Sequence, residues 1–235
     1  MADEFHECEI KTRVLTSVET GRPPLEFDLL EALLWRPATG YFMLERHVAR
    51  LRDSAEYFGF RFDGAALVDQ LGEAAASLSA EDHKVRVVLS RSGDLAISAA
   101  PLSAIARPAV QRVRLAKRPI DRADSFLYHK TSRRVVYEAA LAEVRAAHPD
   151  ADDVILWNEH GEITESSTAN VVIELNGELL TPPIDCGLLD GTFRRWLIDQ
   201  RQIVERAISS EMLRAARRIH LINSVRKWMP AILID

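Results

Sequence analysis

The sequence predicts a mixed α/β protein built from two halves. Helical and strand-like patterns alternate along most of the 235 residues, a length that allows one large domain or two modest ones. Between Pro101 and Asp124 the pattern is interrupted by prolines and basic residues. We therefore expect a smaller N-terminal α/β domain over residues 1–107, a linker over 108–124 and a larger C-terminal α/β domain over 125–235.

Composition and charge exclude several classes of protein. Hydrophobic residues make up 47% of the chain and charged residues 28%, as in ordinary globular domains. The net charge of −5 offers no overall basic field for nucleic acid or anionic lipid. No apolar run approaches the ~20 residues of a membrane span, and the acidic N-terminus does not resemble a secretory signal, so we expect a cytoplasmic protein. Cys8 and Cys186 match no metal or redox spacing. The sequence leaves a disulfide between them open, although a reducing compartment is the simpler interpretation.

The N-terminal half is expected to contain a sheet and two helices. Residues 27–35 are apolar and predict either a strand or a short buried helix, because periodicity does not decide between them. Further strands are expected at 40–44, 85–89 and 95–99, the last two as a hairpin, with helices at 45–58 and about 65–78.

The C-terminal half repeats the alternation. Asn176-Gly177 gives the strongest hairpin signal, because both central residues of a tight turn need positive φ. The expected strands are 110–115, 154–157, 170–175, 178–181, 202–208 and 219–222, and the expected helices are 131–147, 191–201 and 210–217, the last capped by Ser209 or Ser210.

Two stretches carry residues that suggest chemistry. Lys130 precedes the helix expected at 131–147, and Glu165 lies in a predicted loop that leads into the strand at 170–175. Taken singly, such residues are more often a solvated lysine and a capping carboxylate. Together, an amine and an acid could form the two poles of a pyridoxal phosphate site.

Gly191-Thr192 opens a predicted helix and is a candidate anion site, because the first N–H groups and the helix dipole face outwards there. Most such residues only cap the helix, and Asp190 is an unfavourable neighbour for a phosphate. Arg50 lies off the apolar face of its predicted helix, so its spacing alone indicates a solvated arginine.

The order of these motifs resembles the class IV aminotransferases, which are fold-type IV pyridoxal phosphate enzymes with the cofactor between two domains. The resemblance covers residue 27 to the C-terminus. It rests on five motifs in family order: His47-Val-Ala-Arg50-Leu, Lys130, Thr164-Glu165 with Asn170-Val-Val, Leu188-Leu-Asp-Gly191-Thr192-Phe193-Arg, and Asn223-Ser224.

The resemblance implies a role for each motif. Lys130 would be the Schiff-base lysine and Glu165 the partner of the pyridine nitrogen. Asn170 would fix the loop behind Glu165, and no metal is implied. The phosphate would be held by Arg50, Thr192, the Phe193 amide and Ser224. Lys130 must lose its proton to act, so we expect its pKa to fall through burial and nearby positive charge, for which Arg50 is a candidate.

Within the class, the chain is most similar to aminodeoxychorismate lyases. Residues 31–35, 40–47, 57–60 and 128–131 carry this likeness. It implies conversion of 4-amino-4-deoxychorismate to 4-aminobenzoate and pyruvate, a step towards folate. It further implies a homodimer and a functional link to an aminodeoxychorismate synthase. The substrate has two carboxylates, so Arg91, Arg86 and Asn223 are candidate substrate contacts. The alternative for each arginine is a surface position beside a hairpin.

Three departures bear on the specificity. Val135 replaces a tyrosine of branched-chain aminotransferases, Leu34 stands where relatives often carry an arginine, and Asp190 replaces a common proline. Val135 disfavours a branched-chain aminotransferase but does not separate a lyase from a D-amino acid aminotransferase. An aminotransferase for D- or branched-chain amino acids is kept as the alternative, with a non-catalytic interaction module as the remoter one.

Overall fold

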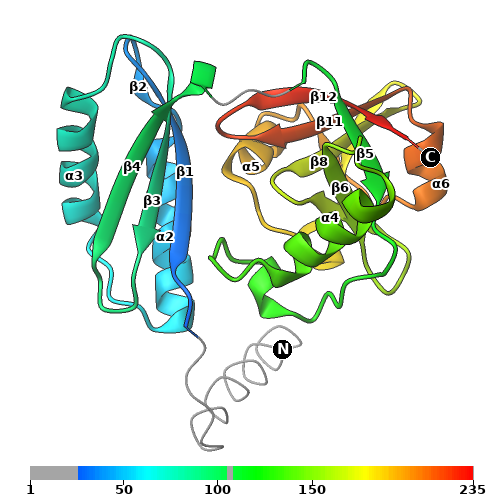
Figure 1. Ribbon diagram of the computed structural model, residues 1–235, viewed down its shortest axis with the longest axis horizontal. Helices are drawn as coiled ribbons and strands as arrows, with labels where there is room; N and C mark the ends of the chain where they lie inside the picture. The colour runs from blue at the N-terminus through cyan, green and yellow to red at the C-terminus, as the bar shows by residue number, and fades with distance from the viewer. Residues whose placement is uncertain (1–25, 105–107, 235) are drawn as a thin grey trace, which may run out of the picture.

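Two sheets form the cores of two α/β halves in the computed structural model, which describes residues 26–104 and 108–234 (Figure 1). Cys8 lies outside these residues. In the described ranges, no helix combines the length and the apolar character needed to cross a membrane.

The N-terminal half has a four-stranded antiparallel sheet with the order β2-β1-β3-β4. Its strands are β1 (Leu29–Arg36), β2 (Gly40–Tyr41), β3 (His83–Leu89) and β4 (Leu95–Pro101). In β3, Val85, Val87 and Leu89 are fully buried on one face, while Lys84 and Arg86 alternate with them. Because side chains of a strand alternate between faces, the charged positions point away from the apolar core.

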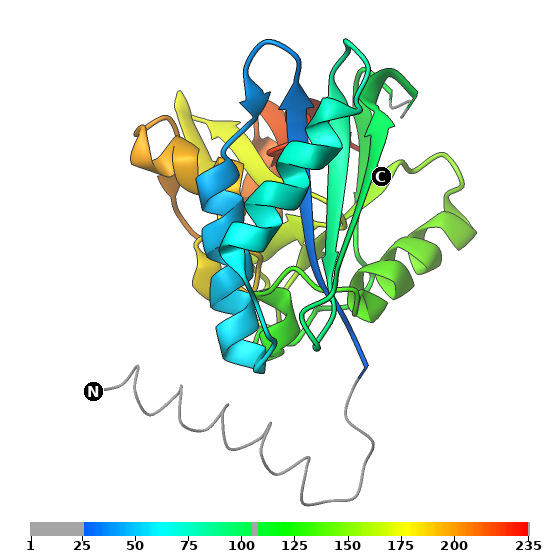
Figure 2. The same cartoon turned by 90° about the vertical axis from the view of Figure 1, so that its left-hand side faces the viewer.

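Two helices cover the apolar face of this sheet: α2 (Leu44–Phe58) and α3 (Gly64–Ala76). Both lie in front of the sheet in Figure 2, and α2 also contacts the C-terminal half. Gly59 ends α2 with φ 67°, and the Asp63 carboxylate caps α3 by accepting from two backbone N–H groups. The other face of the sheet is therefore left for the C-terminal half.

The C-terminal half has an eight-stranded sheet with the order β10-β9-β8-β11-β12-β5-β6-β7. The strands are β5 (Gln111–Leu115), β6 (Asp153–Trp157), β7 (Ile163–Ser166), β8 (Asn170–Leu175), β9 (Glu178–Thr181), β10 (Val204–Glu205), β11 (Arg218–Asn223) and β12 (Lys227–Leu233). β7 also pairs with β8, with Glu165 opposite Asn170, so six of the strands close into a ring. This closure places two predicted site residues directly across from each other.

Helices and short 3-10 turns connect the strands of this half. They are η2 (Ser125–Leu127), α4 (Val135–Ala147), η3 (Ile184–Cys186), α5 (Thr192–Asp199) and α6 (Ser210–Ala215), whereas η1 (Leu102–Ala104) follows β4 in the N-terminal half. α4 packs on β6 through Tyr137 and Val144. Ser209 caps α6, and Asn176 and Gly177 have φ of 52° and 83°, which confirms the predicted hairpin turn.

The two halves are joined by backbone hydrogen bonds at the segment around Lys130. The N–H of Leu30 donates to the Lys130 carbonyl at 2.8 Å, and the N–H of Ser132 donates to the Asp28 carbonyl at 2.9 Å. Leu29 and Thr131 form the β-bridge between these bonds. The lysine segment is therefore held by the start of β1.

Several expectations differ from the structure. The strand expected at 110–115 is present as β5, but it pairs with β12 and β6, so the segment 108–124 belongs partly to the C-terminal sheet and is more than a linker. The helix expected at 131 begins at Val135, since residues 130–132 are engaged with β1. The strand expected at 40–44 is reduced to β2, because α2 begins at Leu44. The strand expected at 202–208 is only β10, and β12 was not predicted.

Candidate active site

A cavity of about 270 Å³ lies between the two halves. From the N-terminal half it is lined by residues of β1, β3 and α2, and from the C-terminal half by residues of the Lys130 segment, β7 and the turns before β8, α5 and β12. Eight of the predicted site residues line it: Arg50, Arg86, Lys130, Glu165, Asn170, Thr192, Asn223 and Ser224.

Lys130 reaches this cavity from the bridged segment rather than from a helix start. Burial, followed by the positive charge of Arg50, lowers the pKa of Lys130 to about 8, against the opposing charge of Glu31. Both causes are those expected from the sequence. Near neutral pH a useful fraction of the amine is therefore unprotonated and can act as a nucleophile or base.

Glu165 lies within β7, where the sequence had indicated a loop. It is 5% exposed, and Tyr137 Oη donates to its Oε1 at 2.7 Å. The Leu189 N–H donates to the same oxygen at 3.2 Å, and Asn170 Nδ2 donates to Oε2 at 3.3 Å. Burial raises the pKa of Glu165 to about 7, while these first two hydrogen bonds and Lys130 act in the opposite direction. The acid is thus poised to exchange a proton with a basic group beside it.

Arg50 is fixed by a buried carboxylate on the neighbouring strand. Its Nε donates to Glu31 Oε1 at 2.8 Å and its terminal nitrogen to Oε2 at 2.7 Å. Burial alone would raise the pKa of Glu31, but the charges of Arg50 and His47 hold that pKa well below its usual range. Arg50 is therefore an oriented cation at the pocket wall, not the solvated arginine that spacing alone indicated.

His47 extends this group to the start of α5. Its Nδ1 lies 2.7 Å from Glu31 Oε2, and its Nε2 lies 3.3 Å from the Thr192 hydroxyl. Thr192 is the first residue of α5, whose first-turn N–H groups are unpaired within the helix. An arginine, a hydroxyl and a helix start therefore meet at one end of the cavity, a combination suited to an anion.

The remaining predicted residues divide into two groups. Asn223 Nδ2 donates to the Thr168 carbonyl, and the Ser224 hydroxyl donates to the Ala32 carbonyl, both at 3.3 Å, so β11 ends against the pocket. The Phe193 ring instead packs against Trp196 and Trp228 in the core, which leaves only its backbone amide near the anion end.

Arg91 is not brought to the cavity. Its guanidinium lies 4.6 Å from the centre of the Phe60 ring and donates to the Phe58 carbonyl at 2.9 Å. The turn after β3 turns this side chain back onto α2 and the apolar core. The expectation that Arg91 meets substrate in this pocket is therefore not supported by its position, whereas Arg86 does line the wall.

Three contributing side chains were not identified as site residues from the sequence. Glu31 has a recognisable signal, because it is the one charged residue in the apolar run 29–35. His47 and Tyr137 have none, since each occupies an apolar-face position of its helix and becomes informative only through its partner across the fold.

The lining is strongly cationic. Among the described residues it includes seven lysines and arginines but two carboxylates, and Glu31 is already engaged by Arg50 and His47. The cations are Arg50, Lys84, Arg86, Lys130, Arg133, Arg134 and Arg226. Low-dielectric walls focus such a field, so the cavity favours a ligand with several negative charges.

Comparisons with known proteins agree on the family. A Schizosaccharomyces pombe protein provisionally named aminodeoxychorismate lyase is 30% identical over 82% of this chain and 84% of its own length. The crystal structure of a Mesorhizobium loti protein, provisionally named an amino-acid aminotransferase, is 36% identical. It superposes with a TM-score of 0.81 over 89% of this chain and all of that one. A Methanocaldococcus jannaschii protein provisionally named a branched-chain-amino-acid aminotransferase is 24% identical over 83% of this chain and 74% of its own length.

The sequence profile described as amino-transferase class IV matches residues 28–234, which include both sheets and all the pocket residues. The chain belongs to the class IV aminotransferase family and is a pyridoxal phosphate-dependent enzyme.

Proposed function

We propose that the protein converts 4-amino-4-deoxychorismate to 4-aminobenzoate and pyruvate. The observation that carries this proposal is the excess of cations around Lys130 and Glu165, since the substrate brings two carboxylates in addition to the cofactor phosphate. The relative from Schizosaccharomyces pombe, which is similar over most of both chains, supports the same reaction.

The residues of the cavity fit the cofactor. Arg50, the Thr192 hydroxyl, the Phe193 amide and Ser224 would hold the phosphate, because they offer a fixed guanidinium, hydroxyls and the N–H groups of a helix start. Glu165 would face the pyridine nitrogen, and Lys130 would bond to the cofactor carbon. When bound, pyridoxal phosphate supplies an electron sink that stabilises negative charge on the substrate carbon next to the amine.

Lys130 and Glu165 would divide the proton transfers. Glu165 is buried beside the cavity and would keep a proton on the ring nitrogen by supplying the countercharge. The free Lys130 Nζ would take the proton from the ring carbon that bears the substrate amine. Cleavage of the C–O bond would release enolpyruvate, to which Lys130 would return the proton, and the ring would become aromatic. This gain favours elimination over amino transfer.

Arg86 and Asn223 are the proposed contacts for the substrate carboxylates. Arg86 is exposed on the pocket side of β3, and Asn223 ends β11 on the opposite wall. Two sites on facing walls would hold the ring between them while Lys130 acts.

The test is an assay of the purified protein with enzymatically generated aminodeoxychorismate. We expect pyruvate and 4-aminobenzoate in equal amounts without an amino acceptor, and no product from Lys130→Ala. Steady turnover of an amino acid and a ketoacid, with no aminobenzoate formed, would overturn the proposal.

An aminotransferase is the second candidate, because the Mesorhizobium loti relative at 36% identity carries that provisional name. Among amino donors, the cationic lining favours acidic over branched aliphatic side chains. Adding each amino acid to the loaded enzyme and following loss of the cofactor's visible band distinguishes this candidate from the lyase.

We further propose a cytoplasmic homodimer that acts after an aminodeoxychorismate synthase in folate synthesis. The sequence resemblance supports this assembly. Sedimentation of the loaded enzyme at several concentrations tests the dimer, and a coupled assay with a synthase tests the link.

A further inference from the structure

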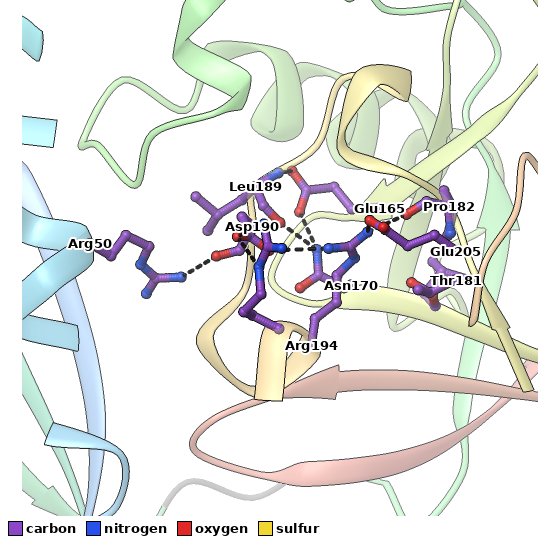
Figure 3. A network of polar contacts seen from close by, with 11 residues as sticks. Arg50, Glu165, Asn170, Thr181, Pro182, Leu189, Asp190, Arg194 and Glu205 are labelled. Carbon is purple, nitrogen blue, oxygen red and sulfur yellow. Dashed lines mark hydrogen bonds and ion pairs between the residues drawn. The ribbon is translucent and has the colours of Figure 1, made fainter. Parts of the chain in front are cut away.

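A short loop joins the two ends of the pocket through its backbone. The Leu189 N–H donates to Glu165 Oε1 at 3.2 Å, and the carbonyl of the next residue, Asp190, accepts from Arg50 at 3.2 Å (Figure 3). Asn170 Nδ2 also donates to the Leu189 carbonyl at 2.8 Å. The acid of one half and the arginine of the other are thus bonded to adjacent residues.

The Asp190 side chain points away from these bonds and onto α5. Its Oδ1 accepts from Arg194 at 3.1 Å, and its Oδ2 accepts from Arg195 Nε at 2.8 Å. Arg194 is completely buried and also donates to the Pro182 carbonyl at 2.7 Å and to Glu205 at 2.5 Å. Asp190 therefore connects the loop to an arginine that is itself fixed in the interior.

An unpaired aspartate beside an anion site would repel the anion, but the charge of Asp190 is balanced in this arrangement. Two guanidinium groups accompany the Asp190 carboxylate, and its side chain is absent from the pocket lining. The loop is also closely packed, because a Cβ at Gly191 would lie 2.0 Å from the Asn170 side-chain oxygen. Its position is thus set by Asp190 on one side and by Asn170 on the other.

We propose that Asp190 is a positioning residue that sets both ends of the cofactor site at once. Held by Arg194 and Arg195, it keeps the Leu189 N–H on Glu165 and its own carbonyl on Arg50. The inference rests on the proposed roles of Glu165 and Arg50, but it assigns neither a contact with cofactor nor a chemical step to Asp190.

The experiment compares Asp190→Asn with Asp199→Asn in the cofactor-free protein. Asp199 is a matched control, since it is the last residue of α5, the helix that the Asp190 side chain contacts, and pairs with Arg46 at 2.8 Å, away from the loop. The protein is titrated with three ligands: pyridoxal phosphate, inorganic phosphate and pyridoxal. Inorganic phosphate tests binding at the Arg50 end of the pocket, and pyridoxal tests binding at the Glu165 end. We expect Asp190→Asn to lower the affinity for all three ligands by about tenfold, which is the effect of losing one charge-assisted hydrogen bond. Asp199→Asn should bind all three as the parent does.

Two further variants separate this inference from the proposed function. Arg50→Gln should lower the affinity for phosphate far more than the affinity for pyridoxal. Glu165→Gln should lower the affinity for pyridoxal far more than the affinity for phosphate. If both leave all probes unchanged, the site assignment fails. If they respond as expected but Asp190→Asn alters neither small probe, or only one, the coupling by Asp190 is refuted.

A melting curve of each cofactor-free variant checks the fold. Should Asp190→Asn not fold, Arg195→Gln removes one of the two guanidinium partners from a half-exposed position. Arg195→Gln should lower the affinities for phosphate and for pyridoxal, both by a smaller factor than Asp190→Asn. Unchanged binding of both ligands would overturn the inference.

Discussion

Glu31 and Arg50 meet through two hydrogen bonds of 2.8 and 2.7 Å, one to each carboxylate oxygen. The Glu31 side chain is 2% exposed and that of Arg50 15%. This two-point geometry fixes the plane of the guanidinium as well as its position. The same carboxylate also contacts His47, so β1 and α2 are tied together at the cofactor end of the pocket.

Replacing Glu31 with glutamine should therefore damage both stability and cofactor binding. Removing one partner of a buried ion pair leaves an uncompensated charge, and we expect a loss of roughly 3 kcal/mol in the free energy of unfolding. Urea denaturation of the cofactor-free protein measures it. Glu56→Gln, an exposed change on α2, is the control, and equal stability of the two variants would contradict the prediction.

The pKa of about 8 at Lys130 predicts how fast the protein captures cofactor at different pH values. The capture rate of pyridoxal should rise with pH until about 8 and then level off, because only the neutral amine attacks. Arg50→Gln removes a charge that lowers this pKa, so its plateau should begin at higher pH. Stopped-flow absorbance measures the rates.

Arg46→Gln serves as the control for that series, since Arg46 lies on α2 and pairs with Asp199 instead of facing the pocket. Pyridoxal is used because it lacks the phosphate that Arg50 would bind. A plateau at the same pH in the parent and in Arg50→Gln would show that Arg50 does not influence the amine.

Arg86 and Arg91 should respond differently to substitution. Arg86→Gln should raise the KM for the lyase substrate by about tenfold, as expected for loss of one charged hydrogen bond to a carboxylate. Arg91→Gln should leave KM near the parent value and lower the melting temperature, because its guanidinium packs on Phe60 and bonds to Phe58. A raised KM in Arg91→Gln together with an unchanged KM in Arg86→Gln would indicate that Arg91, and not Arg86, contacts the substrate.

Gly191 should not tolerate alanine. The added Cβ would meet the Asn170 oxygen at 2.0 Å, which forces the loop or the amide away from Glu165. We expect cofactor affinity to fall by at least about tenfold, measured by titration of the cofactor-free protein.

Gly72→Ala is the matched control, because it lies inside α3 with nothing within 4 Å of the added Cβ. It should stabilise the protein by about 0.5–1 kcal/mol, since alanine favours a helix. Parent-like cofactor affinity in Gly191→Ala would contradict the close packing of the loop.

Much of the fold could be predicted from the sequence where local patterns agree with the tertiary environment. The Asn176-Gly177 turn and the alternation along β3 are examples, because turn geometry and burial both act on residues close in sequence. The errors occur where distant contacts decide. The helix expected after Lys130 starts later because the backbone of that segment is hydrogen-bonded to the start of β1. The strand β12 was not predicted, and its Pro230 is a residue that argues against an inner strand.

The candidate site shows the same division. The residue order along the chain was enough to indicate Lys130, Glu165 and Arg50. It could not indicate that Glu31 orients Arg50, because this ion pair exists only after β1 and α2 pack together. It also misplaced Arg91, whose direction is set by the turn after β3 and by the aromatic cluster below it.

The backbone bridge at Lys130 has a mechanical consequence. By sequence the lysine belongs to the C-terminal half, yet Leu30 and Asp28 of the N-terminal half hold the residues around it. Glu165, in contrast, stands on the closed ring of strands. A movement of β1 relative to the ring of strands would therefore change the distance between the Lys130 amine and the Glu165 acid.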